Sequence, residues 1–298
     1  MQGTIDGFNY GAVTPVAAYL MACLGSALGL RCTTRSLRTE RSWKPGWLAL
    51  GATSIGSGIW TMHFIAMIGF QVEEVSIGYD VPTTLASLAV AIVVVGVGVF
   101  IVGYRGASRG ALISAGTITG LGVAAMHYIG MAGMRLHGRM EYDTAIVVLS
   151  VVIAVVAATA ALWAAVSIHG FLPSLGASMV MGIAVTGMHY TGMAAISVHL
   201  QGLTRVSAGG GSASSIMFPM LLGPVVFLVL AGVVVMFDPL LVLGEGEWDR
   251  PEVKSVRKDA PARPVWPPAY DAATDHRPPP APLTGPGRHQ GSQDARDW

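Results

Sequence analysis

The sequence predicts an all-α, polytopic membrane protein with seven transmembrane helices, arranged as three two-helix repeats plus one helix. Hydrophobic residues make up 52% of the 298 residues and charged residues only 12%, about half the charged share of an ordinary soluble domain. The apolar residues form long continuous stretches, and one short motif recurs in alternate stretches. The lipid bilayer is therefore the first expected partner of this chain.

Seven continuously apolar stretches reach roughly the 20 residues that a helix needs to cross a hydrocarbon core. They lie near residues 11 to 30, 46 to 70, 84 to 104, 110 to 134, 144 to 168, 174 to 199 and 216 to 242. A membrane β-barrel would show alternating apolar residues instead. No basic region precedes the first stretch, so we expect it to remain in the mature protein and not to be cleaved as a signal peptide.

Basic residues collect in cytoplasmic loops and so orient a helix bundle. Most of the basic residues near the spans lie in two connecting segments, after the first and third stretches. They are Arg31, Arg35, Arg38, Arg41, Lys44, Arg105 and Arg109. The loop after the second stretch carries Glu73, Glu74 and Asp80 and no basic residue. We therefore expect a multi-pass protein of the plasma (cytoplasmic) membrane, with the N-terminus outside and the C-terminus in the cytoplasm.

The sequence divides into a membrane domain, residues 1–243, and a tail, residues 244–298. The tail is rich in Pro, Arg and Asp and poor in aliphatic residues, so it cannot bury enough apolar surface to fold alone. We expect it to be disordered and cytoplasmic, and we expect no nucleic-acid partner. Cys23 and Cys32 do not have the spacing of a metal-binding or redox pair.

A Met-His-aromatic motif occurs in the second, fourth and sixth stretches. The copies are Met62-His63-Phe64-Ile65-Ala66-Met67, Met126-His127-Tyr128-Ile129-Gly130-Met131 and Met188-His189-Tyr190-Thr191-Gly192-Met193. With this composition, Met-His-aromatic is expected only about 0.03 times by chance. The motif therefore indicates three repeats, each a pair of helices with the motif on the second helix.

Two further positions recur around each histidine. A glycine lies seven residues before it, at Gly56, Gly120 and Gly182, and a small residue lies three after it, at Ala66, Gly130 and Gly192. Small residues let membrane helices approach closely. We therefore expect both sets to bring the second, fourth and sixth helices together around one axis, where the three motifs converge.

Imidazole and thioether groups are neutral ligands that suit copper, and Cu(I) above all. On a helix, each histidine and the methionine four positions later share a face. The candidate metal ligands are His63, His127, His189, Met62, Met67, Met126, Met131, Met188 and Met193. Tyr128 and Tyr190 are candidates to hydrogen-bond a ligand bound there.

Two alternatives to a copper site remain open. Histidines on facing helices can hold haem, although methionines beside every copy fit copper at least as well. Intramembrane histidine can also serve packing, hydrogen-bonded within the bundle, while methionine fills irregular gaps. Three copies on alternate helices favour ligation, because ionisable groups inside a membrane usually have a function.

At these residues the sequence resembles the MHYT family of bacterial integral membrane sensor proteins, over about residues 9 to 243. Only Met188-His189-Tyr190-Thr191 gives the motif in full; the second copy has Ile129 for Thr, and the first has Phe64 and Ile65 for Tyr and Thr. The resemblance implies a seven-helix domain that binds copper and senses oxygen, carbon monoxide or nitric oxide. Family members often carry cyclic-di-GMP domains. After the membrane domain this sequence has only the tail of residues 244–298, so it is expected to signal through a separate cytoplasmic partner.

The spans hold no buried carboxylate, nucleophile–base pair or phosphate loop that would carry chemistry, so we do not expect an enzyme. Two functions remain open. One is a membrane sensor that responds to a diatomic gas or to redox state. The other is a copper-binding or copper-handling membrane protein without a signalling role.

Overall fold

The structure, a computed structural model, describes residues 3–7, 9–39, 41–136, 138–168, 170–200 and 213–238. These residues lie within one compact unit, Met1–Asp249. The tail predicted for residues 244–298 lies outside the described residues. The described part contains seven long helices: α1 (Val13–Leu37), α2 (Lys44–Ile68), α3 (Val81–Arg105), α4 (Arg109–Ala132), α5 (Thr144–Ser167), α6 (Phe171–Ala194) and α7 (Ala213–Met236).

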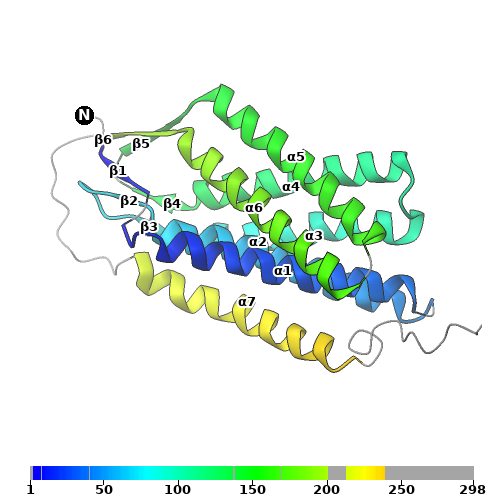
Figure 1. Cartoon of the computed structure of the whole chain (residues 1–298). Helices are drawn as coiled ribbons and strands as arrows, with labels where there is room; N and C mark the ends of the chain where they lie inside the picture. Colours follow the sequence, from blue (N-terminus) through cyan, green and yellow to red (C-terminus); the bar gives the residue numbers. More distant parts are fainter. Residues whose placement is uncertain are drawn as a thin grey trace, which may run out of the picture. The chain divides into compact units, whose positions relative to one another are not determined.

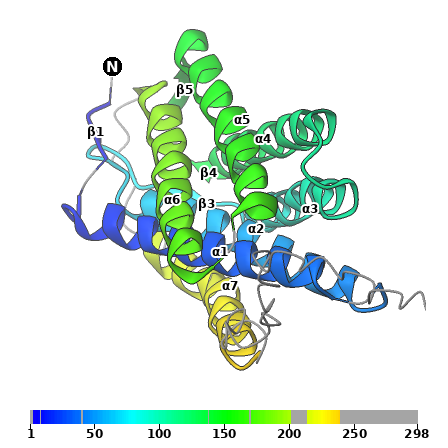
Figure 2. The ribbon, with the colours of Figure 1, turned by 45° about the vertical axis from the view of Figure 1, so that its right-hand side comes forward.

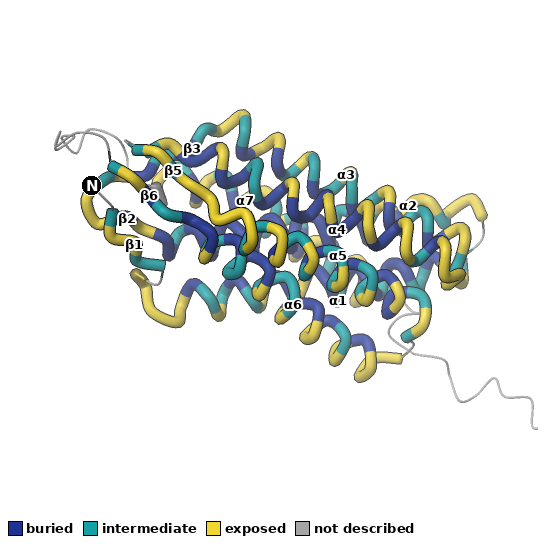
Figure 3. The backbone as a smooth tube through the Cα atoms, turned by 90° about the horizontal axis from the view of Figure 1, so that it is seen from above, coloured by how far each residue is buried: buried dark blue, intermediate teal, exposed yellow. Residues whose placement is uncertain are grey.

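The first six helices form a closed ring. Each helix packs against the next one in the sequence, and α6 packs back against α1. α7 stands outside the ring and packs against α2 and α1 (Figure 1). In the rotated view, α7 lies on the opposite side of α1 from α5 and α6 (Figure 2). The interior of the ring is lined by buried residues, and exposed residues lie mainly on the outward faces (Figure 3).

Short strands join the two ends of each repeat, a feature that the sequence did not predict. They pair antiparallel as β1 (Ile5–Asp6) with β2 (Gln71–Val72), β3 (Gly78–Tyr79) with β4 (Met134–Arg135), and β5 (Gly138–Tyr142) with β6 (Ile196–Leu200). In each pair, one strand precedes the first helix of a repeat and the other follows its second helix. Each repeat is therefore a strand–helix–helix–strand unit, and all six strands lie at one end of the bundle (Figure 1).

Six of the seven helices are long and apolar enough to cross a membrane, namely all except α2. The chain is therefore a multi-pass membrane protein. α2 has the same length as α1 and packs along it, but it contains Gly51, Ser54, Gly56, Ser57 and Gly58, all buried. A helix enclosed by other helices does not need apolar side chains toward lipid, which accounts for its composition.

Two predicted boundaries were wrong. The sixth apolar stretch was expected to remain helical to residue 199, but α6 ends at Ala194 and the following residues form β6. This strand contains the β-branched residues Ile196 and Val198, which favour extended backbone, and it pairs with β5. The basic segment expected as a loop after the first stretch is partly helical, since Arg31 and Arg35 lie within α1.

The strand ends are tied to the helices by one hydrogen bond that recurs in all three repeats. In each, the backbone N–H of a residue shortly before the first helix donates to the carbonyl six residues after the motif histidine. The pairs are Asn9 to Gly69 (3.1 Å), Asp80 to Gly133 (2.8 Å) and Asp143 to Ala195 (2.8 Å). The repeats therefore share their backbone geometry at the end where the motifs lie.

Asp80 also caps the N-terminus of α3. Its carboxylate accepts hydrogen bonds from the Thr83 backbone N–H (3.0 Å) and the Thr83 hydroxyl (2.6 Å), and the Arg135 guanidinium donates to its other oxygen (3.1 Å). These bonds, those of Thr83 foremost, lower the pKa of Asp80 from the ordinary 3.8 to about 2. The ionised carboxylate thus stabilises the start of α3 and its link to β4.

We expect Asp80→Asn to lower the thermal midpoint at pH 7, because asparagine keeps a capping oxygen but loses the charge. A carboxyl whose pKa is depressed by folding stabilises the protein above its unfolded pKa, and this stability is lost as pH falls through the folded value. The difference between the wild type and the variant should therefore shrink below about pH 4 and disappear below about pH 2. Thermal melts followed by circular dichroism in detergent would measure it; a difference independent of pH would contradict this account.

Candidate metal centre

The three motif histidines meet inside the ring. His63 on α2, His127 on α4 and His189 on α6 are each 0% to 1% exposed. Their Nδ1 atoms form a triangle, with separations of 3.0 Å between His63 and His189, 3.1 Å between His127 and His63, and 3.3 Å between His189 and His127. The sequence prediction that the motifs converge is therefore confirmed for the histidines, and we call these three residues the triad.

The aromatic residue after each histidine packs edge-on against its ring. The ring centroids are 4.6 Å apart for His63 and Phe64, 4.8 Å for His127 and Tyr128, and 5.0 Å for His189 and Tyr190, with interplanar angles of 75° to 86°. Edge-to-face contacts of this kind are favourable. They help to hold each imidazole in the orientation that points Nδ1 at the axis.

Tyr128 and Tyr190, predicted to bind a ligand through their hydroxyls, flank the triad as ring neighbours. The Tyr128 hydroxyl lies 2.7 Å from Ser150 Oγ on α5 and hydrogen-bonds with it. The first repeat has Phe64 at this position and so carries no hydroxyl there. The position shared by all three repeats is therefore an aromatic ring.

The small residue three positions after the histidine makes room for the neighbouring imidazole. A Cβ placed on Gly130 would lie 2.7 Å from His63 Nε2, and one on Gly192 would lie 2.5 Å from His127 Nε2. Both distances are shorter than real Cβ contacts. These glycines allow α4 and α6 to accept a ring from the helix of the preceding repeat, as the sequence pattern predicted.

The glycines seven positions before the histidines act elsewhere, which corrects the prediction for them. A Cβ on Gly56 would meet the backbone of Ile92 on α3 at 2.9 Å, and one on Gly120 would meet Val155 on α5 at 2.4 Å. A Cβ on Gly182 would meet Cys23 on α1. These positions pack each motif helix against the first helix of the next repeat, so they close the ring and do not face the axis.

Hydrogen bonds alone cannot satisfy a triangle of ring nitrogens. An imidazole nitrogen either donates one hydrogen or accepts one, never both. Of three Nδ1 atoms, at least two must therefore be of the same kind, and that pair opposes two hydrogens or two lone pairs at about 3 Å. A metal ion that accepts all three lone pairs satisfies every Nδ1 atom, so this arrangement fits a metal site.

The dimensions of the triangle agree. Nitrogens separated by 3.0 to 3.3 Å lie on a circle of about 1.8 Å radius, slightly less than the usual metal–nitrogen distance of about 2.0 to 2.1 Å, so His63, His127 and His189 could all reach one ion. A metal held by three protein ligands would be able to bind an exogenous ligand as well. The Nε2 atoms of His63 and His127 are buried without a hydrogen-bond partner in the described part of the chain.

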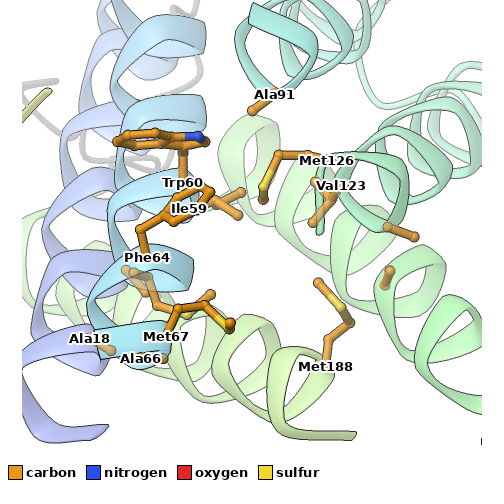
Figure 4. Packing of buried hydrophobic residues seen from close by; sticks show 14 of the residues in the cluster. Ala18, Ile59, Trp60, Phe64, Ala66, Met67, Ala91, Val123, Met126 and Met188 are labelled. Carbon is orange, nitrogen blue, oxygen red and sulfur yellow. The ribbon is translucent and has the colours of Figure 1, made fainter. Parts of the chain in front are cut away.

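The six motif methionines surround the triad. Those directly before the histidines, Met62, Met126 and Met188, are buried. Those four positions after, one turn nearer the strands, are Met67, Met131 and Met193; the first two are buried and the third is half-buried. Figure 4 shows Met67, Met126 and Met188 extending from different helices toward the same interior space.

The motif alone does not indicate the residues on the other side of the triad. Ile59, Val123 and Val185 lie four positions before the three histidines, one helical turn farther from the strands,. Their regular spacing from the histidines is the signal that marks them. The triad therefore lies between a layer of methionines toward the strands and a layer of branched aliphatic residues away from them.

The fold and the site define a multi-pass membrane protein in which three repeats each contribute one histidine to a shared buried centre. Residues 56–115 and 120–178 match the MHYT family, described as a bacterial signalling protein N terminal repeat. The chain thus carries the MHYT domain of bacterial signalling proteins, as the sequence motif predicted. Each match runs from within one motif helix to the helix of the next motif, so the sequence repeat is offset from the strand–helix–helix–strand unit.

The chain is similar to several curated signalling proteins. It is 37% identical over 192 residues to the bifunctional diguanylate cyclase/cyclic di-GMP phosphodiesterase MucR of Pseudomonas aeruginosa, covering 63% of this chain and 28% of the relative. It is 34% identical over 209 residues to the cyclic di-GMP phosphodiesterase NbdA of the same species, covering 65% and 26%. The signaling protein YkoW of Bacillus subtilis is 28% identical over 199 residues, covering 64% and 24%. The chain thus spans about a quarter of these relatives' length, and no solved structure matches it significantly.

We expect Gly192→Ala to weaken metal binding by roughly tenfold or more. A Cβ at this position displaces the His127 ring, and changes to the residues that orient a metal-binding side chain typically lower metal affinity by about that factor. Gly187→Ala is the matched control. Gly187 lies on the same helix, and a Cβ there meets nothing within 4 Å. Titration with metal, followed by elemental analysis, would compare the two variants. Equal binding by both would show that the Gly192 contact does not position His127.

Proposed function

We propose that this protein is a membrane sensor that binds one copper ion at the triad and responds to a diatomic gas, such as oxygen, carbon monoxide or nitric oxide, or to redox state. The observation that carries the proposal is the triangle of buried Nδ1 atoms, 3.0 to 3.3 Å apart. Three nitrogens from three different repeats meet without a carboxylate or thiolate among them. A neutral ligand set in an apolar bundle is the expected environment for a soft, singly charged ion.

The methionines favour copper over zinc. Zinc also binds three histidines, but thioether is a soft ligand that selects Cu(I). We propose that a sulfur from Met67, Met131 or Met193 approaches the triad from the strand side, and that Met62, Met126 and Met188 complete the soft surroundings. A bound copper ion would supply a centre able to take a neutral diatomic ligand. Haem is the weaker alternative, because three Nδ1 atoms 3.0 to 3.3 Å apart leave no room for a macrocycle between them.

The geometry favours a sensor over a copper-handling protein. The three histidines are 0% to 1% exposed, and a protein that passes copper onward needs ligands along a route to the surface. His199, on strand β6 ten residues after His189, is exposed and lies 3.5 Å from Glu141, so it is not part of the buried centre. A closed site retains its ion and responds to small uncharged molecules.

Signalling requires a ligand that binds two conformations differently. The triad joins α2, α4 and α6, so a change in the positions of its nitrogens moves these three helices relative to one another. The three helices begin at the end away from the strands, where Lys44 and Arg109 are the first residues of α2 and α4. We propose that this movement reaches a separate cytoplasmic partner. The class of partner that we propose is the cyclic-di-GMP enzymes, such as those named among the relatives. We propose further that the bundle itself catalyses no reaction.

We expect His63→Ala, His127→Ala and His189→Ala each to lower Cu(I) affinity by about tenfold or more and to a similar degree, because each removes one ligand of a shared centre. His199→Ala is the control and should bind as the wild type. Anaerobic titration of the detergent-purified protein, with metal analysis and an infrared spectrum under carbon monoxide, would measure the effects.

Met67→Leu and Met131→Leu test the sulfur ligands, because leucine keeps the apolar volume and removes the thioether. Weaker Cu(I) binding at unchanged thermal stability is the expected result. A wild-type protein that binds no Cu(I), or that retains zinc in preference, would overturn the copper assignment. Small and unequal effects of the three histidine variants on stability alone would favour a packing role.

We further propose that α2 crosses the membrane, with the N-terminus outside and the C-terminus in the cytoplasm. Arg31, Arg35 and Lys44 lie at the end of the bundle away from the strands, and basic residues mark the cytoplasmic side. Alkaline phosphatase, which is active only outside the cytoplasm, should be active when fused after Ser76 and inactive when fused after Ala107. The reverse pattern, or inactivity at both sites, would refute this topology.

A further inference from the structure

A cavity of about 50 Å³, partly open, lies inside the ring of α1 to α6. Its lining includes Ile59, Val123 and Val185, the layer four positions before the triad histidines. Because four positions make about one helical turn, the cavity begins one turn from the triad, on the side away from the strands.

The cavity extends along the axis of the repeats. Ile55, Thr119 and Met181 also line it, and each lies eight positions before a triad histidine. Eight positions make about 2.2 turns, so these residues lie roughly 12 Å farther from the strands than the histidines and about 80° round each helix. The void therefore continues away from the triad along the inside of the ring.

The third repeat leaves this space open because its first helix has small side chains. Alanines of α5 form much of the lining, Ala158 among them. Ala158 follows the capping residue Asp143 at the same distance as Val95 follows the equivalent Asp80 on α3. The smaller alanine on α5 thus breaks the threefold pattern beside the axis.

Water is a poor occupant of this cavity. A buried water usually makes about three hydrogen bonds, and the only lining side chains with hydroxyls are Ser26 and Thr119. Apolar cavities stay dry and take up apolar guests such as xenon, and one of roughly 150 Å³ holds benzene. This cavity is about a third of that volume,, so it suits a single small molecule.

We propose that this cavity is a binding site for one small, uncharged, apolar molecule, and that it holds such a molecule one helical turn from the triad before ligation. The second part rests on the proposed function, because it requires a metal at the triad. The first part does not rest on the proposed function, because residues of α1 to α6 form the cavity whether or not a metal is bound. Diatomic gases and xenon belong to the class of molecule that fits.

Xenon is the probe, used with metal-free, detergent-purified full-length protein and followed by xenon NMR. The wild type should give a saturable change in the xenon chemical shift, and Ala158→Leu, which fills the cavity, should lose it. The control Ala160→Leu makes the same change on α5 at an exposed position and should retain the shift. Ala158→Val, which reproduces the side chain of Val95, serves if the leucine variant does not fold.

A wild type without a saturable shift, or a shift that survives both substitutions of Ala158, would overturn the cavity as a binding site. In the copper-loaded protein, the filled variants should bind carbon monoxide more slowly at unchanged copper occupancy. Unchanged association rates would overturn the role of the cavity in supplying the triad. Absence of copper binding would instead count against the proposed function, while the xenon result on metal-free protein would still stand.

Discussion

Three polar rings can share one point inside a membrane protein only if the helices that carry them approach closely at the same depth. The repeat structure meets this condition, because each repeat presents its histidine at the same place on its second helix. Gly130 and Gly192 then leave the space that the neighbouring rings occupy, and an aromatic ring beside each histidine fixes its orientation. The ring of helices, the strand pairs and the small residues all follow from holding these three nitrogens together.

Much of this arrangement was predictable from sequence. The apolar stretches located the helices, and the repeated motif identified the helices and the residues that meet at the axis. The atom that faces the axis was not predictable, because helical periodicity places a side chain on a face without fixing its rotation. The strand pairs were missed because all three join segments far apart in sequence, and because β1 to β4 have only two residues each, too few to show alternation. Gly56 and its equivalents were assigned to the wrong interface, since spacing alone does not say which neighbour a small residue meets.

The threefold pattern is imperfect, and its departures lie around the triad. Phe64 replaces tyrosine in the first repeat, Ala66 replaces glycine, and Ala158 replaces the valine of the preceding repeat. The departures leave the histidine triangle nearly equilateral but make the space around it unequal. The sulfur side and the aliphatic side of the centre do not depend on these departures, because all three repeats carry a methionine four positions after the histidine and a branched aliphatic residue four positions before it. What the departures add is the open volume beside Ala158.

If α2 crosses the bilayer as proposed, its glycines and hydroxyl residues make it a weak insertion signal by itself. α1 immediately precedes it, is apolar enough to cross a membrane, and touches it backbone to backbone, with Gly25 and Gly58 so close that a Cβ on either would lie 2.7 Å from the other's Cα. A hairpin of this kind can leave the translocation machinery as one unit, with the apolar helix carrying the less apolar one. On this proposal, the helix that delivers the first histidine enters the membrane together with the partner encoded just before it.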